Sequence, residues 1–183
     1  MKIVIAEKIS PAAVELLRKE SRWKLVLPEE IRGDLAGQLE LAEALIVRSA
    51  VAVDAALLEG AKKLRVIGRA GVGVDNIDLE AATKKGIAVM NTPGANAVAV
   101  AEHTLALMLA LARHLPRADH LTRGGKWEKK SLQGTELRSK TLGIVGLGRV
   151  GVEVARRARA FGMAVMAHDP FVSTSVAREL EIK

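Results

Sequence analysis

The sequence predicts an α/β fold built on parallel sheets, and three features predict it. Short apolar runs of strand length recur along the first hundred residues, at 3–6, 24–27, 44–47, 64–67 and 87–89. Helical segments lie between them, at 12–17, 55–58 and 79–85. A third feature is a glycine-rich turn between an apolar strand and a helix near residue 146. Alternation of this kind is typical of a parallel sheet with helices on both faces.

The chain is expected to form two domains, 1–96 and 97–183. The turn-forming cluster at 91–94 marks the boundary, because proline fixes φ and glycine supplies special backbone angles. From 97 to about 118 the apolar residues are too continuous for a surface helix, which predicts a helix buried on most sides or lying between domains.

The rest of the second domain is expected to hold one strand–helix–strand unit. Residues 119–138 are polar and without periodicity, which predicts an extended excursion. Beyond it we expect a buried strand at 141–145, a helix at 149–161, a strand at 163–167 and a further helix from residue 173.

Composition excludes several classes of protein. The 183 residues carry a net charge of +7, but the basic residues are scattered among acids, and two Phe, two Trp and no Tyr give no platform for stacking bases. We expect no nucleic-acid partner, and a basic surface suits a small anionic substrate. The absence of cysteine excludes disulfides and thiolate catalysis.

No membrane segment is expected either. The most apolar stretch, 98–112, contains Glu102, His103 and Thr104, so its uninterrupted run is far shorter than the roughly 20 residues a bilayer requires. The N-terminus enters an apolar strand without the pattern of a secretory signal, which predicts a cytoplasmic protein.

Three glycines at residues 146–151 carry the clearest chemical signal. Gly146 would form the tight turn, Gly148 would let the backbone approach a pyrophosphate, and Gly151 would allow close packing of helix on strand. The helix that follows presents free N–H groups and a positive dipole end to phosphates. A strand precedes the motif, so we expect the first βαβ unit of a Rossmann dinucleotide-binding domain.

Asp169 ends the second strand 23 residues after Gly146, close to the separation that a ribose contact requires. A carboxylate accepts hydrogen bonds from the ribose hydroxyls but repels a 2′-phosphate, so NAD is expected over NADP. The alternative is that Asp169 and Pro170 merely terminate the strand.

The sequence resembles the D-2-hydroxyacid dehydrogenase family, most closely the branch that oxidises 3-phospho-D-glycerate in serine synthesis. The blocks that carry the resemblance occur in family order along the whole chain, at 47–50, 68–78, 91–96, 101–104, 125–127, 134–137 and 146–151. The resemblance implies a flavodoxin-like substrate domain followed by an incomplete Rossmann domain.

It also implies roles for individual residues. Substrate contacts would come from Arg48, Ser49, Val72, Gly73 and Asn96. A guanidinium suits a carboxylate or phosphate, and Arg48 follows the strand 44–47, where ligands bind in open α/β sheets; the alternative is a solvated charge at a strand end.

The same resemblance places cofactor contacts along both domains. Val72 and Thr104 would lie near the nicotinamide, and the backbone N–H groups of Arg149 and Val150 would meet the pyrophosphate.

No residue of this chain is expected to act as the catalytic acid or base. Asp78 precedes a helix and fits an N-cap, and Asp75 fits a turn. The four histidines, at 103, 114, 120 and 168, offer no convincing proton donor, and no cluster has metal-ligand spacing.

Family members continue beyond the equivalent of Lys183, and their catalytic arginine and paired histidine and glutamate lie in that later stretch. We therefore expect a truncated portion without turnover of its own. The strand at 141–145 would expose its edge to water. The long helix and the arm around Trp127, which resembles a family dimer arm, predict a homodimer.

The leading prediction is NAD-dependent oxidation of 3-phospho-D-glycerate by the parent protein. Two alternatives stay open at this point. One is another D-2-hydroxyacid dehydrogenase, of glyoxylate or lactate type, and the other is a non-catalytic module that dimerises or binds a nucleotide.

Overall fold

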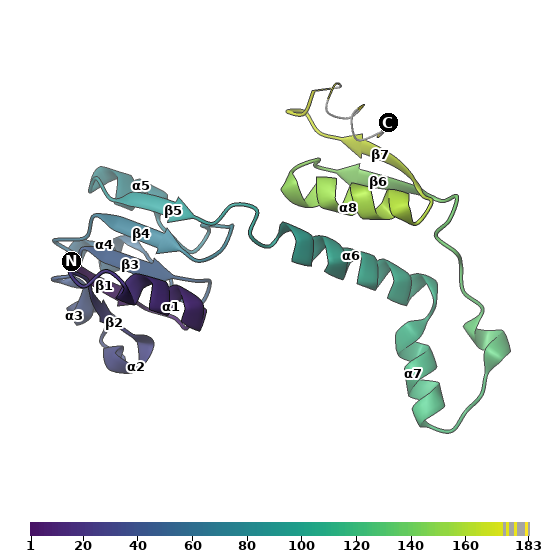
Figure 1. Ribbon diagram of the computed structural model, residues 1–183, viewed down its shortest axis with the longest axis horizontal. Helices are drawn as coiled ribbons and strands as arrows, with labels where there is room; N and C mark the ends of the chain where they lie inside the picture. The colour runs from purple at the N-terminus through teal and green to yellow at the C-terminus, as the bar shows by residue number, and fades with distance from the viewer. Residues whose placement is uncertain (174, 176–177, 179–181, 183) are drawn as a thin grey trace. The chain divides into compact units, whose positions relative to one another are not determined.

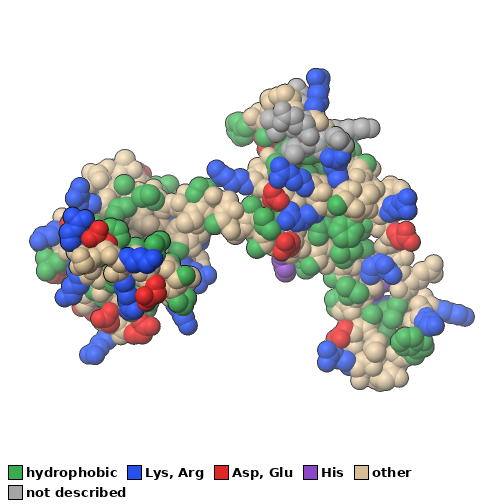
Figure 2. Space-filling model, viewed as in Figure 1, with side chains coloured by type: hydrophobic (Ala, Val, Ile, Leu, Met, Phe, Trp, Pro, Cys, Tyr) green, Lys and Arg blue, Asp and Glu red, His purple; other side chains and the backbone are tan. Residues whose placement is uncertain are grey.

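The computed structural model describes residues 1–173, 175, 178 and 182. It divides the chain into two compact units, Met1–Ala95 (unit 1) and Asn96–Lys183 (unit 2), each of which is described by itself. Figure 2 shows Lys and Arg side chains interspersed with acidic and apolar ones over one face of the units.

Unit 1 is built on a five-stranded sheet in the order β2-β1-β3-β4-β5, in which every neighbouring pair is parallel (Figure 1). The strands are β1 (Lys2–Ile5), β2 (Lys24–Val26), β3 (Ala44–Val47), β4 (Val66–Arg69) and β5 (Ala88–Asn91). This is the flavodoxin-like doubly wound order, so the predicted fold class is confirmed. All the strand C-termini meet at one edge of the sheet.

The helices of unit 1 are α1 (Pro11–Arg18), α2 (Pro28–Ile31), α3 (Leu35–Leu39), α4 (Ala55–Gly60) and α5 (Leu79–Lys84). The short helices α2 and α3 were not predicted. Asp54 and Asp78 begin α4 and α5 by accepting hydrogen bonds from Leu57 N at 2.8 Å and Ala81 N at 2.9 Å. The capping role predicted for Asp78 is confirmed.

Alternate residues of the strands point to opposite faces of this sheet. Ile3 and Ile5 pack with Val14 and Leu17 of α1 on one face. On the other face a larger core joins strand residues such as Leu45 and Ile67 to α3, α4 and α5. Each buried aliphatic side chain contributes about 1.5–3 kcal/mol to stability. Because α1 lies on its face without a second helix of the unit, that face keeps an open groove.

Unit 2 contains α6 (Ala97–Ala112), α7 (Leu115–Arg123), a 3₁₀ turn (Lys129–Leu132), β6 (Thr141–Val145), α8 (Arg149–Ala160) and β7 (Ala164–His168). Strands β6 and β7 are parallel, and α8 connects them. Ala101 and Leu105 of α6 pack against Val154 of α8. The predicted strand–helix–strand unit is confirmed, whereas the helix expected from residue 173 falls largely on residues outside the described set.

The single long helix predicted from 97 to about 118 is wrong, because the chain breaks between α6 and α7, which are bent by 62°. Pro116 has no N–H to donate to the carbonyl of Ala112, and its ring would collide with that carbonyl. His114 instead adopts a left-handed conformation with φ 53°, and Ala112 O accepts a hydrogen bond from Thr135 N at 2.8 Å. Helix α7 also occupies the start of the excursion predicted at 119–138.

Within unit 2, two elements are less buried than predicted: α6 is not buried on most sides, and β6 is not a buried strand. Helix α6 buries Ala97, Ala101 and Leu105, but Leu111 is 79% exposed. In β6 the pattern alternates between exposed and half-buried residues, and Val145 is 89% exposed. Leu142 and Ile144 are half-buried against α8. Among the described residues, β6 pairs only with β7, so the prediction of an unpaired edge on this strand agrees with the described part of unit 2.

Candidate functional site

One candidate site lies at the carboxyl edge of the sheet in unit 1. Arg48 follows the last residue of β3, and Arg69 is the last residue of β4. The register pairs Val47 with Arg69, so Arg48 lies one residue beyond the level of Arg69 on the adjacent strand. Ligands bind at this edge in open α/β sheets.

The loop that carries Arg48 and Ser49 is held by two side chains. The Glu7 carboxylate, just past β1, accepts backbone N–H bonds from Arg48 at 2.8 Å, Ala50 at 3.1 Å and Val51 at 3.1 Å. From the other direction, Asn76 Nδ2 donates to the carbonyls of Arg48 at 2.9 Å and Val51 at 2.7 Å. We call residues 48–51 the arginine loop.

The charge of Glu7 is stabilised in this position. Burial of the carboxylate would by itself raise its pKa, but the three backbone hydrogen bonds and the nearby charge of Arg48 outweigh that effect. The pKa of Glu7 therefore lies below the usual glutamate value.

A basic cavity of about 470 Å³ opens beside the arginine loop. Its lining residues are Lys8, Ile9, Ser10, Arg48 and Ala70. Arg48 Nη1 donates only a long bond of 3.4 Å, to the carbonyl of Lys8, so most of its donors remain available. Two cations and a hydroxyl around one cavity form a receptor for an anion.

Arg69 adds a third cation at the same edge. Its Nε atom is buried without a hydrogen-bond partner among the described residues, none of which places a carboxylate within ion-pair distance of it. A buried guanidinium N–H without an acceptor is costly, so this position favours an anionic ligand. Arg69 was not among the site residues predicted from the sequence.

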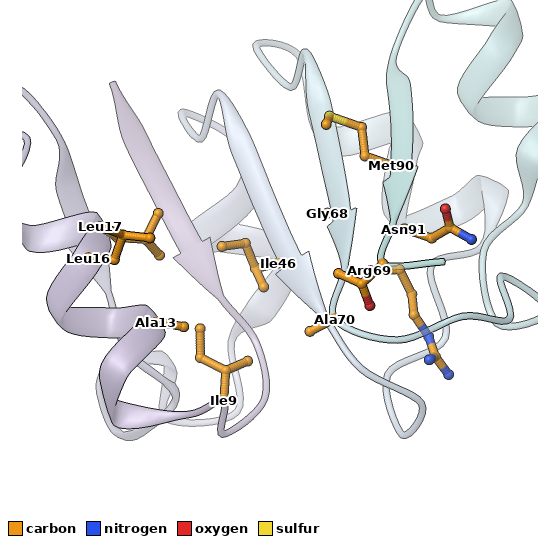
Figure 3. Close-up of a pocket in the computed structure, with 11 residues that line it drawn as sticks. Ile9, Ala13, Leu16, Leu17, Ile46, Gly68, Arg69, Ala70, Met90 and Asn91 are labelled. Carbon is orange, nitrogen blue, oxygen red and sulfur yellow. The ribbon is translucent and has the colours of Figure 1, made fainter. Parts of the chain in front are cut away.

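Figure 3 shows the guanidinium of Arg69 extending past the end of β4, away from an apolar groove. This groove, of about 320 Å³, lies between α1 and the strands β4 and β5 and is lined by residues such as Leu16, Leu17 and Met90. Its walls offer little to a hydroxy acid. The polar chemistry lies at the strand ends.

Val72 and Gly73 form the turn that follows β4. The carbonyl of Val72 accepts a bond from Asn91 Nδ2 at 2.7 Å, which fixes the turn against β5. Gly73 is exposed. The structure thus brings four of the predicted substrate residues, Arg48, Ser49, Val72 and Gly73, to the carboxyl edge of unit 1. The fifth, Asn96, precedes α6 in unit 2.

A second candidate site is the glycine turn of unit 2, in which each glycine is required for a different physical reason. Gly146 has φ 95°, a conformation that other residues rarely adopt. A Cβ on Gly148 would meet nothing within 4 Å, so space is open above the turn. A Cβ on Gly151 would collide with the carbonyl of Gly146, which explains the close packing of α8 on the loop.

The first turn of α8 is ready to receive an anion. Gly148 is the N-cap and provides no side-chain hydrogen bond, so the N–H groups of Arg149 and Val150 are not capped by that residue. Free N–H groups and the helix dipole favour negative charge at this point.

Asp169 lies next to this turn but already has protein partners. Its carboxylate accepts N–H bonds from Leu147 at 2.7 Å, Phe171 at 2.8 Å and Val172 at 3.2 Å. The bonds from Phe171 and Leu147 do most to hold the pKa of Asp169 below its ordinary value. A carboxylate has about four acceptor directions, so one remains for a ribose hydroxyl. Asp169 therefore also fastens the glycine turn to the end of β7, a role that the sequence did not predict.

Thr104 lies in the same unit as the glycine turn. It lines a cavity of about 380 Å³ together with Gly146, Val150 and Gly151. Its hydroxyl donates to the carbonyl of Val100 at 2.8 Å within α6.

Sequence reasoning missed Glu7, Lys8 and Arg69. Arg69 stood within a block quoted for the resemblance, and Glu7 and Lys8 follow the first strand, so position after a strand was the signal available for all three.

Among the described residues, no group of His, Asp and Glu could hold a metal ion. No single described helix is long and apolar enough to cross a membrane, although α6 and α7 together pass such a test by length and composition.

A family model described as "D-isomer specific 2-hydroxyacid dehydrogenase, catalytic domain" matches residues 3–180. The chain belongs to this family, as the resemblance predicted. Within it, the chain is 50% identical over 183 residues to the D-3-phosphoglycerate dehydrogenase of Archaeoglobus fulgidus, covering 100% of this chain and 35% of that relative. The chain thus spans about a third of the length of the curated relatives it matches.

Solved structures of dehydrogenases also match this chain. The D-lactate dehydrogenase of Aquifex aeolicus, complexed with NAD and lactic acid, matches with a TM-score of 0.86 at 27% identity, covering 100% of this chain and 55% of that one. The TT0316 protein of Thermus thermophilus matches with a TM-score of 0.84 at 36% identity, covering 94% of this chain and 57% of that one. The prediction that NAD is the family's cofactor is confirmed.

Proposed function

We propose that this chain provides the substrate- and cofactor-binding elements of an NAD-dependent dehydrogenase that oxidises 3-phospho-D-glycerate. The observation that carries the proposal is a basic strand-end site in a chain 50% identical to a D-3-phosphoglycerate dehydrogenase. A substrate with both a carboxylate and a phosphate needs several cations, and Lys8, Arg48 and Arg69 supply three.

On the cofactor side, the residues present fit a dinucleotide. Gly148 leaves the space that a pyrophosphate requires, and the N–H groups of Arg149 and Val150 would bind its oxygens. Asp169 stays ionised and would accept a ribose hydroxyl, while its charge would repel the 2′-phosphate of NADP. NAD, when bound, supplies the acceptor for the hydride.

On the substrate side, Arg48, Arg69 and Lys8 would bind the anionic groups and orient carbon 2, with Ser49, Val72, Gly73 and Asn96 as further contacts. Thr104 and Val72 would lie near the nicotinamide. We propose that the group that takes the hydroxyl proton lies outside these 183 residues, so the chain alone binds ligands without turning them over.

Binding and turnover test these proposals separately. Calorimetry with NAD and with ADP-ribose should show binding by the chain, abolished by Gly148→Ala. Titration of 3-phospho-D-glycerate should show binding that Arg69→Leu weakens by about tenfold or more. Reduction of NAD in the presence of 3-phospho-D-glycerate by this chain would overturn the claim that it lacks turnover. D-lactate or glyoxylate binding more tightly than 3-phospho-D-glycerate would favour the other members of the family.

We also propose a homodimer formed through α6 and the arm around Trp127. Leu107, Leu111 and Leu115 are 58%, 79% and 52% exposed, and the Trp127 ring is 76% exposed with Lys129 Nζ 5.5 Å from its centre. Apolar exposure on this scale favours association. Sedimentation at micromolar concentration should show a dimer, and a stable monomer would refute the proposed homodimer.

The cytoplasmic location and the role in serine synthesis stay predictions.

A further inference from the structure

The Glu7 carboxylate binds the backbone of the arginine loop and not the Arg48 side chain. It lies beside Arg48, close enough for their charges to interact, yet its oxygens bind the backbone of the loop. Oε1 accepts from Arg48 N and Val51 N, and Oε2 accepts from Ala50 N. Among the described residues, no ion pair joins Glu7 to the Arg48 guanidinium.

This arrangement has a consequence for the guanidinium. A carboxylate used by three N–H groups has little capacity left for the fork of donors on the arginine side chain. The loop is closed from the other direction by Asn76, whose Nδ2 binds the carbonyls of Arg48 and Val51. Glu7 and Asn76 together therefore fix the backbone of Arg48 while leaving its side chain to the basic cavity.

We propose that Glu7 is a positioning residue for the anionic substrate: it holds the arginine loop in its binding conformation so that the Arg48 guanidinium faces the ligand. The proposal rests on the function proposed above, in which Arg48 contacts a phosphate or carboxylate. Glu7 itself does not touch the substrate.

Geometry and simple electrostatics make opposite predictions here, which makes the proposal testable. Glu7 is a negative charge next to a site for anions, so its removal alone should strengthen anion binding. If Glu7 positions the loop, its removal should weaken binding in spite of that gain. The variant Glu7→Gln keeps the shape of the side chain, removes the charge and turns an N–H₂ group toward a backbone donor. The variant Glu7→Asp keeps the charge but shortens the side chain.

Glu43 offers a matched control in the same unit. Its Oε2 accepts the N–H of Lys2 at 3.2 Å and lies 3.6 Å from the N-terminal ammonium, at the opposite edge of the sheet. Glu43→Gln removes a carboxylate bound to backbone without affecting the arginine loop.

The experiment is a titration of the full 183-residue chain with 3-phospho-D-glycerate, together with hydrogen exchange of the amides in the arginine loop. Glu7→Gln and Glu7→Asp should each weaken binding by about tenfold, as expected when hydrogen bonds to a charged group are lost, and Glu43→Gln should leave it unchanged. Exchange at Ala50 and Val51 should accelerate in both Glu7 variants. Binding by Glu7→Gln that equals or exceeds that of the unaltered chain would overturn the proposal.

Hydrogen exchange separates this proposal from the proposed function. If the unaltered chain does not bind 3-phospho-D-glycerate, the function proposed above fails, but the exchange data still decide whether Glu7 holds the loop. If a Glu7 variant does not fold, the unaltered chain provides the test. The N–H groups of Ala50 and Val51 should exchange more slowly than that of Ser49, for which the described residues offer no acceptor. Equal exchange at all three would overturn the proposal.

Discussion

The arginine loop of unit 1 and the glycine turn of unit 2 both follow a parallel strand, and both are proposed to face an anion, yet they are held in different ways. Residues 48–51 keep their conformation through the side chains of Glu7 and Asn76. The glycine turn instead requires residues without a side chain, since a Cβ at 151 would collide with the backbone and Gly146 has φ 95°. A loop tied by side chains brings charged groups to a ligand, whereas a loop of glycines brings its backbone N–H groups.

Gly151→Val is expected to reduce the free energy of unfolding and the NAD affinity more than any other substitution considered below. The new side chain meets the carbonyl of Gly146, so α8 must move away from the turn, at a cost of about 1–3 kcal/mol. Chemical denaturation should show this loss, and calorimetry should show no binding of NAD.

Gly148→Ala is the matched control because its Cβ meets nothing within 4 Å. The substitution should lower the free energy of unfolding by less than about 1 kcal/mol, the scale of a change at an N-cap. It should still abolish NAD binding, because the added methyl group fills the space proposed for the pyrophosphate. If Gly148→Ala binds NAD normally, the turn does not receive the pyrophosphate, and the two loops do not share the role of facing an anion.

Asp169→Asn should narrow the preference for NAD over NADP by roughly five- to tenfold, because the charge that repels a 2′-phosphate is removed. It should also loosen the turn, since the bonds to Leu147, Phe171 and Val172 are weakened. Affinities for both cofactors, measured by calorimetry, give the ratio. An unchanged ratio would mean that Asp169 serves only to end β7.

Glu7 should make the stability of unit 1 depend on pH. Its pKa is lowered in the folded chain, so its contribution is fully present above the ordinary glutamate pKa and is lost as pH falls through the lowered value. The difference in unfolding free energy between the unaltered chain and Glu7→Gln should therefore shrink toward acidic pH. A difference that stays constant from neutral to acidic pH would show that the carboxylate charge does not hold the arginine loop.

Asp78→Ala is expected to have the smallest effect on function, because it should change stability without changing ligand affinity. Loss of the bond from Ala81 N removes the cap of α5 and should cost about 1 kcal/mol in denaturation experiments. Affinities for NAD and 3-phospho-D-glycerate should not change, because this cap lies outside both loops. A loss of 3-phospho-D-glycerate affinity would instead connect the Asp78 region with the strand-end site.

The sequence determined the features that depend on local pattern. Alternating strands and helices predicted the parallel sheet of unit 1, the three glycines predicted the turn before α8, and Asp78 predicted a cap. Each depends on residues within a few positions of one another, so spacing and residue type suffice. Pro116 held the local signal for the break at His114, but the continuous apolar pattern suggested a single helix.

The tertiary structure decided what depends on residues far apart in the chain. Glu7 reaches Arg48 across 41 positions because β1 and β3 are neighbours in the sheet. The register of β3 and β4 brings Arg69 to the same sheet edge as Arg48, and the pairing of β6 with β7 brings Asp169 to Leu147. No spacing rule contains these contacts, since they exist only once strands have paired. The sequence therefore predicted the glycine turn, whereas the hydrogen bonds of Glu7 and Asn76 to the arginine loop and of Asp169 to the glycine turn were determined by the tertiary structure.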